Sequence, residues 1–232
     1  MTSICANLQA VRQRIEQAAE LCGRSPSSVS LLAVSKTFPA EAVREAAAAG
    51  QRAFGENYVQ EGCAKVEALA DLKLEWHFIG PLQSNKTRQV ANHFAWVHSI
   101  DRLRIAERLS AQRDPHLPPL QVCLQVNVSG ELSKSGVAPG EAEELALAIS
   151  ALPRLTLRGL MAIPEPSDDP AVLAERFGEL ARLKQRLAAR GLALDTLSMG
   201  MSADLEEAIA GGATLVRIGS AIFGTRPSPV QA

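Results

Sequence analysis

LLAVSKT, residues 31–37, is a short apolar run that stops on a lysine. Four apolar residues followed by Ser35 and Lys36 predict a buried strand at residues 31–36, whose last residue emerges at the edge of a sheet. A lysine held there can be partly desolvated, and a neutral amine is a nucleophile toward aldehydes and ketones. The competing interpretation is a solvated lysine at a strand end, which is the usual situation of this residue type.

Strand and helix patterns alternate along the chain on either side of this run. An amphipathic helix, with apolar residues at steps of three and four, is predicted at residues 4–22. Further strands are predicted at residues 52–57, 75–80, 96–100, 120–128, 157–163, 194–200 and 214–219. Helices are predicted between the strands, at residues 39–49, 58–69, 83–93, 102–113, 141–152, 173–190 and 203–210.

This order is typical of an α/β chain folded as a (β/α)8 TIM barrel, here with an extra N-terminal helix. A length of 232 residues suits one such barrel, so we expect residues 1–232 to form a single domain. A doubly wound sheet would need a glycine-rich dinucleotide turn after an early strand, and the sequence has none. Functional residues are therefore expected at the carboxyl ends of the strands.

Charge and cysteine content exclude several classes of partner. The formal net charge is −1, from 24 basic and 25 acidic residues, which favours neither nucleic acid nor an anionic membrane. Cys5, Cys22, Cys63 and Cys123 are scattered, so we expect free, mostly buried thiols and no metal site. The start lacks a leader pattern, and no run approaches about 18 apolar residues. We therefore expect a cytoplasmic, soluble protein. We also expect a monomer.

The last two predicted strands end in sequences that suit a phosphate. In barrels of this kind a phosphate site commonly follows strands seven and eight, which here end at S-M-G-M-S, residues 198–202, and R-I-G-S, residues 217–220. Ser202 opens a predicted helix, so it is either a helix N-cap or a phosphate ligand. Gly219 permits close approach of the backbone and Ser220 adds a hydroxyl, although this pair is also ordinary turn sequence. Arg217 lies in an apolar run, where a buried guanidinium needs a partner.

Other polar residues receive ordinary structural interpretations. Asn57 ends the second predicted strand. His77 lies within a strand, and an imidazole satisfied by the backbone is favoured over a catalytic base. His93 and His98 do not share a helical face, so no metal site is predicted. Ser84, before a predicted helix, is interpreted as a cap rather than a substrate contact.

Longer strings carry a family resemblance that covers residues 31–226. A-V-S-K-T, F-G-E-N-Y-V-Q-E, W-H-F-I-G-P-L-Q-S-N-K, L-R-G-L-M-A-I-P, S-M-G-M-S-A-D-L-E-E-A-I and V-R-I-G-S-A-I-F-G-T-R resemble the pyridoxal-phosphate homeostasis proteins. That family is similar to the barrel domain of alanine racemase. The resemblance implies pyridoxal 5′-phosphate bound as a Schiff base on Lys36. It also implies Ser202, Gly219 and Ser220 around the phosphate, Arg217 toward the pyridine nitrogen or the phosphate, and Asn57 and Met199 near the ring.

The sequence departs from the family at one lysine and matches it at another. Many members carry a second lysine two places after the first, where this chain has Phe38. Lys134, in S-K-S-G, matches a lysine that the family is thought to use in handling the cofactor, and it is equally well interpreted as a solvated loop lysine.

Three functions remain open, and the resemblance favours the first. The first is a protein that holds pyridoxal phosphate, passes it to apoenzymes and contributes to vitamin B6 and amino-acid homeostasis, with no catalytic residue and little or no catalysis. The second is a pyridoxal-phosphate-dependent amino-acid racemase. The third is a class I aldolase in which Lys36 attacks a sugar-phosphate ketone. The chain ends soon after the eighth strand and its only tyrosine is Tyr58, so we expect no second domain with an opposing base.

Overall fold

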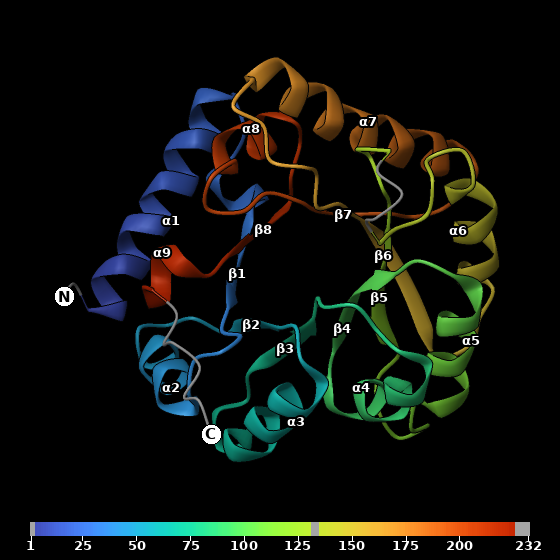
Figure 1. Ribbon diagram of the computed structural model, residues 1–232, viewed down its shortest axis with the longest axis horizontal. Coiled ribbons are helices and arrows are strands. Elements are labelled where there is room, and N and C mark those ends of the chain that lie inside the picture. Colours follow the sequence, from blue (N-terminus) through green and yellow to red (C-terminus); the bar gives the residue numbers. More distant parts are fainter. Residues whose placement is uncertain (1–2, 131–134, 226–232) are drawn as a thin grey trace.

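Eight parallel strands close into a barrel in sequence order in this computed structural model, which describes residues 3–130 and 135–225. Each strand pairs with the next, and β1 (Ser30–Val34) closes the ring by pairing with β8 (Leu215–Ile218). Helices form the outer layer (Figure 1). The predicted (β/α)8 barrel with an extra N-terminal helix is confirmed. Among the described helices, none has the length and apolarity that crossing a lipid bilayer requires.

The remaining elements follow the expected alternation. The other strands are β2 (Ala53–Glu56), β3 (Glu75–Phe78), β4 (Trp96–Ile100), β5 (Leu120–Gln125), β6 (Leu155–Met161) and β7 (Thr196–Ser198). The helices are α1 (Ile4–Leu21), α2 (Ala40–Ala48), α3 (Val59–Ala68), α4 (Thr87–His93), α5 (Leu103–Gln112), α6 (Ala142–Ser150), α7 (Pro170–Ala189), α8 (Leu205–Ala210) and α9 (Ser220–Phe223). Short 3-10 turns, η1 (Pro26–Ser28), η2 (Ala70–Leu72) and η3 (Ser84–Lys86), complete the list.

Side chains alternate between the barrel interior and the helix layer, which decides what each strand can present. Leu32 and Val34 of β1 pack with Ile79 and Leu215 in a small cluster inside the barrel. Ala33, between them, belongs to the larger core beneath the helices. Gly55 keeps the interior open for these residues, because a Cβ there would lie 3.1 Å from Leu32 and 3.2 Å from Ile79. The interior is thus packed with side chains rather than hollow.

Helix α1 covers the seam where the barrel closes. Its buried stripe of Leu8, Val11, Ile15 and Ala18 lies against the elements on both sides of that seam. The side chain of Asn7 donates to the carbonyl of Ile222, 2.8 Å away and 215 residues later in the sequence. The first and last helices are therefore tied together.

Several predicted boundaries were wrong in ways that matter for function. β1 ends at Val34, so Lys36 lies in the following turn rather than in the strand. The helix predicted at residues 203–210 begins only at Leu205. Residues 83–93 form η3 followed by α4, and Ser84 makes no side-chain cap. Helix α9 was not predicted.

The prediction of free, mostly buried cysteines is confirmed only in part. Cys63 and Cys123 are buried, but Cys5 and Cys22 are exposed, so the prediction of mostly buried thiols holds for half of them. All four are free. Lys134 lies outside the described residues.

Candidate functional site

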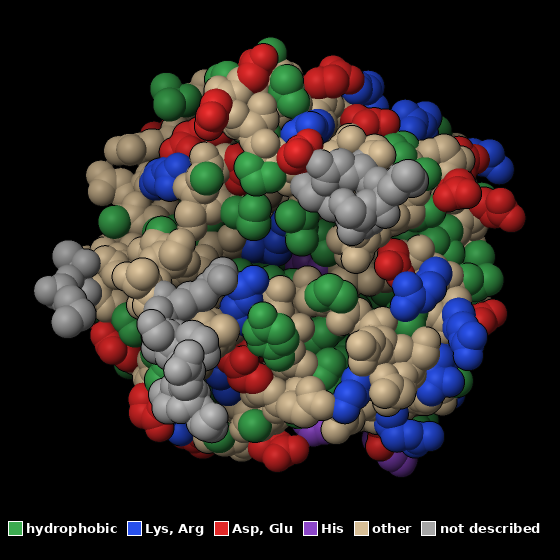
Figure 2. Space-filling model, viewed as in Figure 1, with side chains coloured by type: hydrophobic (Ala, Val, Ile, Leu, Met, Phe, Trp, Pro, Cys, Tyr) green, Lys and Arg blue, Asp and Glu red, His purple; other side chains and the backbone are tan. Residues whose placement is uncertain are grey.

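A cavity of about 250 Å³ opens at the carboxyl ends of the strands, where barrels of this kind place their chemistry. On the face shown in Figure 2, basic side chains lie in the hollow near the middle. The cavity is lined by Val34, Lys36, Asn57, Ile79, Ile163, Met201, Ser202, Ala203, Arg217, Gly219 and Ser220. Of the residues predicted for the site, all but Met199 are in this list.

Met199 packs into the core between the sheet and the helices instead of lining the cavity. The cause is the alternation of β7. The hydroxyl of Ser198 faces the barrel interior, where it contacts His98 and Arg217, so the next side chain must face outward. Met201, two residues further on, lines the cavity.

Lys36 sits on a turn that the fold holds firmly. Val34 and Lys36 share one side of the β1 direction, so both reach the cavity. Thr37 has a left-handed backbone with φ 69°, which is unfavourable for a β-branched residue. Its N–H donates to Glu61 Oε1 at 2.6 Å, which stabilises this conformation. The half-buried Lys36 side chain is thereby directed into the cavity.

A buried ionic group that we call the Lys65 cluster, formed by Lys65, Glu56, Glu61 and Ser35, lies directly behind this turn. Lys65 Nζ donates to the Ser35 carbonyl, to Glu56 Oε1 and to Glu61 Oε1, each at 2.7 Å. The Ser35 hydroxyl donates to the same Glu56 oxygen at 2.6 Å. Burial raises the pKa of Glu56, and the adjacent ammonium of Lys65 opposes that shift. The cluster joins β2 and α3 to the residue that precedes Lys36.

Arg217 is the second basic residue of the cavity, and its guanidinium is almost completely buried. Nη1 donates to Ser198 Oγ and Nη2 to the Ala162 carbonyl, both at 2.8 Å. Burial lowers the pKa of Arg217 to about 10, so it keeps its charge at neutral pH. The sequence predicted that a buried guanidinium at Arg217 would need a partner, and its partners are the Ser198 hydroxyl and the Ala162 carbonyl.

Two loops bring hydroxyls to the cavity. Ser202 precedes α8, whose N-cap is Asp204, so the N-cap interpretation of Ser202 is wrong. Neither Ser202 nor Ser220 uses its hydroxyl in a hydrogen bond to another described residue. Gly219 lies where a Cβ would come within 3.2 Å of the Val34 carbonyl, so a larger residue would require the strand end to move by a few tenths of an ångström. Arg14 of α1 steadies the first loop by donating to the Ser202 carbonyl at 2.9 Å.

Asn57 supplies a polar atom that lacks a partner. Its Oδ1 is buried and accepts no hydrogen bond from the described residues. An unsatisfied buried acceptor costs about 1–3 kcal/mol, so this oxygen favours a ligand that carries a donor.

The hydrogen-bond partners of His77 differ from those that the sequence predicts. His77 faces the barrel interior, but its ring nitrogens contact the side chains of Glu75 and His98 rather than the backbone. His93 lies on the surface beside Glu67. Among residues 3–130 and 135–225, no group of three or more potential ligands is placed to hold a metal ion.

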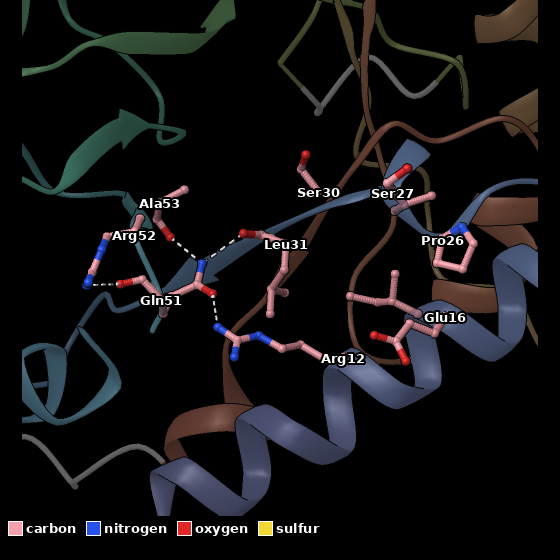
Figure 3. Close-up of a pocket in the computed structure, with 11 residues that line it drawn as sticks. Arg12, Glu16, Pro26, Ser27, Ser30, Leu31, Gln51, Arg52 and Ala53 are labelled. Atoms are coloured by element: carbon pink, nitrogen blue, oxygen red, sulfur yellow. Dashed lines mark hydrogen bonds between the residues drawn. The ribbon is translucent and has the colours of Figure 1, made fainter. Parts of the chain in front are cut away.

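A larger cavity, of about 570 Å³, lies at the opposite end of the barrel, beside the first residues of β1 and β2 (Figure 3). Its central polar side chain, Gln51, donates to the carbonyls of Leu31 and Ala53 at 2.8 and 2.9 Å. Arg12 in turn donates to Gln51 Oε1 at 3.3 Å. These groups are used in tying α1 to the strands, so size alone does not make this cavity the functional site.

Comparisons with known proteins identify the family. The family model described as alanine racemase, N-terminal domain, matches residues 6–227. The pyridoxal phosphate homeostasis protein of Pseudomonas aeruginosa is 62% identical over 226 residues, which cover 97% of each protein.

Solved structures extend the comparison to three dimensions. PipY of Synechococcus elongatus, solved with pyridoxal phosphate bound, is 39% identical, with a TM-score of 0.83 over 96% of this chain and 100% of that one. Alanine racemase from Corynebacterium glutamicum is 18% identical, with a TM-score of 0.70 over 97% of this chain and 64% of that one, and shares the fold alone. The chain belongs to the family of pyridoxal phosphate homeostasis proteins, built on the barrel of the alanine racemase N-terminal domain.

Proposed function

We propose that this protein binds pyridoxal 5′-phosphate in the cavity around Lys36, as a Schiff base on that lysine. It holds the reactive aldehyde, releases it to apoenzymes, and so contributes to vitamin B6 and amino-acid homeostasis with little or no catalysis. The observation that carries the proposal is one cavity that combines a half-buried amine, a buried guanidinium and two hydroxyl-bearing loops. The names of the close relatives and the ligand of PipY support it.

The residues present fit this cofactor. Ser202 and Ser220 line the cavity with hydroxyls that can donate to a phosphate. Asn57 Oδ1 would gain the donor that it lacks. Arg217 brings a fixed positive charge and N–H donors.

Bound pyridoxal phosphate supplies an aldehyde that an amine can capture and a ring that withdraws electrons from the attached carbon. Lys36 holds the group through one carbon–nitrogen double bond, formed with loss of a water molecule. Arg217, if it faces the pyridine nitrogen, donates a hydrogen bond to it and favours the unprotonated ring, which is the weaker electron sink.

The ionisable groups of the cavity support storage rather than turnover. Racemisation needs a base on each face of the substrate carbon. Among the described residues that line the cavity, only Lys36 and Arg217 are ionisable. Tyr58 is 56% exposed and lies outside it. The racemase alternative is favoured by the fold alone. We further propose that the protein is a monomer. We also propose that it is cytoplasmic, since its four cysteines are free, as expected in a reducing compartment.

Visible absorption and chemical trapping test the proposal. The protein incubated with pyridoxal phosphate should show a band that borohydride removes, and mass spectrometry should place the reduced label on Lys36. Lys36→Ala should lose both, whereas Lys86→Ala, at a lysine outside the cavity, should retain them. A label mainly on another lysine would contradict the assignment. Trapping of an added sugar phosphate, with no band from pyridoxal phosphate, would favour the aldolase.

A further inference from the structure

A continuous series of hydrogen bonds crosses the barrel interior and ends on Arg217. We call Glu75, His77, His98, Ser198 and Arg217 the interior network. Glu75 Oε1 lies 2.9 Å from His77 Nε2, and His77 Nδ1 lies 2.9 Å from His98 Nε2. His98 Nδ1 lies 2.8 Å from Ser198 Oγ, which accepts from Arg217 Nη1 at 2.8 Å.

The network joins the two ends of the barrel. Glu75 is the first residue of β3, at the amino-terminal end, and its side chain is 53% exposed. Arg217 lies near the carboxyl end of β8 and lines the cavity. The three side chains between them are buried. A half-exposed carboxylate at one mouth is therefore connected to the guanidinium at the other.

The chemistry of the two ends fixes the position of every proton between them. His77 lowers the pKa of Glu75 by hydrogen bonding, so Glu75 is ionised and can only accept. Burial lowers the pKa of both histidines, which keeps the rings neutral. His77 must then carry its proton on Nε2 and accept at Nδ1, and His98 must do the same. Ser198 donates to His98 and accepts from Arg217.

The buried guanidinium has no ion-pair partner within hydrogen-bond distance among the described residues. A buried charge normally needs compensation. Asp204 acts on Arg217 only through space. The donors of the interior network all point from Arg217 toward Glu75, so each member presents a lone pair on the Arg217 side and a proton on the Glu75 side. The ring of His77 is held in this arrangement by stacking on Trp96, with centroids 5.2 Å apart and planes 7° from parallel.

We propose that Glu75, His77, His98 and Ser198 are positioning residues of the cofactor site: they fix the orientation of Arg217 and transmit to it the compensating charge of Glu75 from the opposite end of the barrel. This assignment rests on the proposed function, because Arg217 lines the cavity proposed to bind pyridoxal phosphate.

Histidine nitrogen NMR tests the network without cofactor. In ¹⁵N-histidine-labelled protein at pH 7.5, His77 and His98 should both be neutral with the proton on Nε2. Glu75→Ala should move the resonances of His98, although Glu75 does not touch that ring. Glu75→Gln retains an acceptor and should return them toward the wild-type positions. The matched control is Glu67→Ala, which breaks the surface pair with His93 and should move only the His93 resonances.

The second readout is the absorption band of the protein loaded with pyridoxal phosphate. Glu75→Ala should shift the band and Glu67→Ala should leave it unchanged. A proton on Nδ1 of either buried histidine, His98 resonances unmoved by Glu75→Ala, or equal band shifts in both variants would overturn the proposal. If no pyridoxal phosphate bound at all, the proposed function would fail while the NMR result still decided the network.

Discussion

Replacement of Lys65 by methionine should be among the most damaging single changes to this fold. The Lys65 side chain is 7% exposed. Its ammonium bridges Glu56, whose side chain is fully buried, and Glu61, whose side chain is 29% exposed. Lys65→Met keeps the apolar stem but leaves Glu56 as an uncompensated buried charge. Breaking a buried pair in this way costs about 3–5 kcal/mol. For a chain of this size that loss corresponds to a fall in melting temperature of roughly 6–20 °C.

Urea denaturation at pH 7.5 measures this loss, and two further variants isolate its cause. Arg44→Met removes a surface pair with Asp71, whose partners are 48% and 59% exposed, and should cost at most about 1 kcal/mol. The double variant Lys65→Met/Glu56→Gln no longer buries a charge and should recover most of the stability. A loss for Lys65→Met no larger than that for Arg44→Met would refute the reasoning.

The loss should also depend on pH in a defined direction. Burial raises the pKa of Glu56 even with Lys65 present, so without Lys65 the folded carboxyl takes up a proton at higher pH than the unfolded chain, whose value is about 4.3. The variant then loses stability as pH rises from about 4.3 to the folded pKa. The deficit relative to the wild type should be smallest near pH 4–5 and largest at neutral pH and above.

Three further measurements test the site and the interior. Ser202→Ala should weaken pyridoxal phosphate binding roughly ten- to a hundredfold, because one charge-assisted hydrogen bond is lost. The free energy of unfolding should change little, because the N-cap of α8 is Asp204 and not Ser202. A change in stability without a change in binding would contradict this prediction. Burial lowers the pKa of His77 and His98, so as the pH falls the unfolded chain takes up protons before the folded protein does. The free energy of unfolding should therefore fall below about pH 6.5, by up to about 1.4 kcal/mol per pH unit for each histidine. A flat profile in urea titrations would show that these rings titrate alike in both states. L-Alanine in deuterated water should exchange its α proton far more slowly than about 1 per second with the loaded protein, and turnover at enzymatic rates of about 1–1,000 per second would favour the racemase.

The sequence could predict those features of the fold and the site that depend on a single helix or strand and its position in the barrel. The strand at residues 96–100 was predicted with its observed bounds because its pattern is local. Lys36, Arg217 and Gly219 could be assigned to one end of the barrel because parallel strands all end there. Met199 was misplaced because its orientation follows from that of Ser198, whose contacts with His98 and Arg217 are visible only in the structure.

The parts that sequence missed depend on distances across the fold. Nothing local indicates that Lys65 reaches back to the Ser35 carbonyl, 30 residues earlier. The contact between His98 and Ser198 spans 100 residues and exists only because both strands face one interior. Polar partners of this kind follow from barrel closure and register, which a single sequence leaves open.

The pairing of β1 with β8 has a consequence for when the site comes into existence. Lys36 follows the first strand, whereas Arg217, Gly219 and Ser220 belong to the last, so nearly the whole chain separates the two halves of the cavity. A nascent or truncated polypeptide that lacks the eighth strand has the amine but neither the guanidinium nor the second hydroxyl-bearing loop. Contacts between such distant segments form late, because the entropy of closing the loop must be overcome first. If the cavity binds pyridoxal phosphate as proposed, only molecules that have completed folding should capture it.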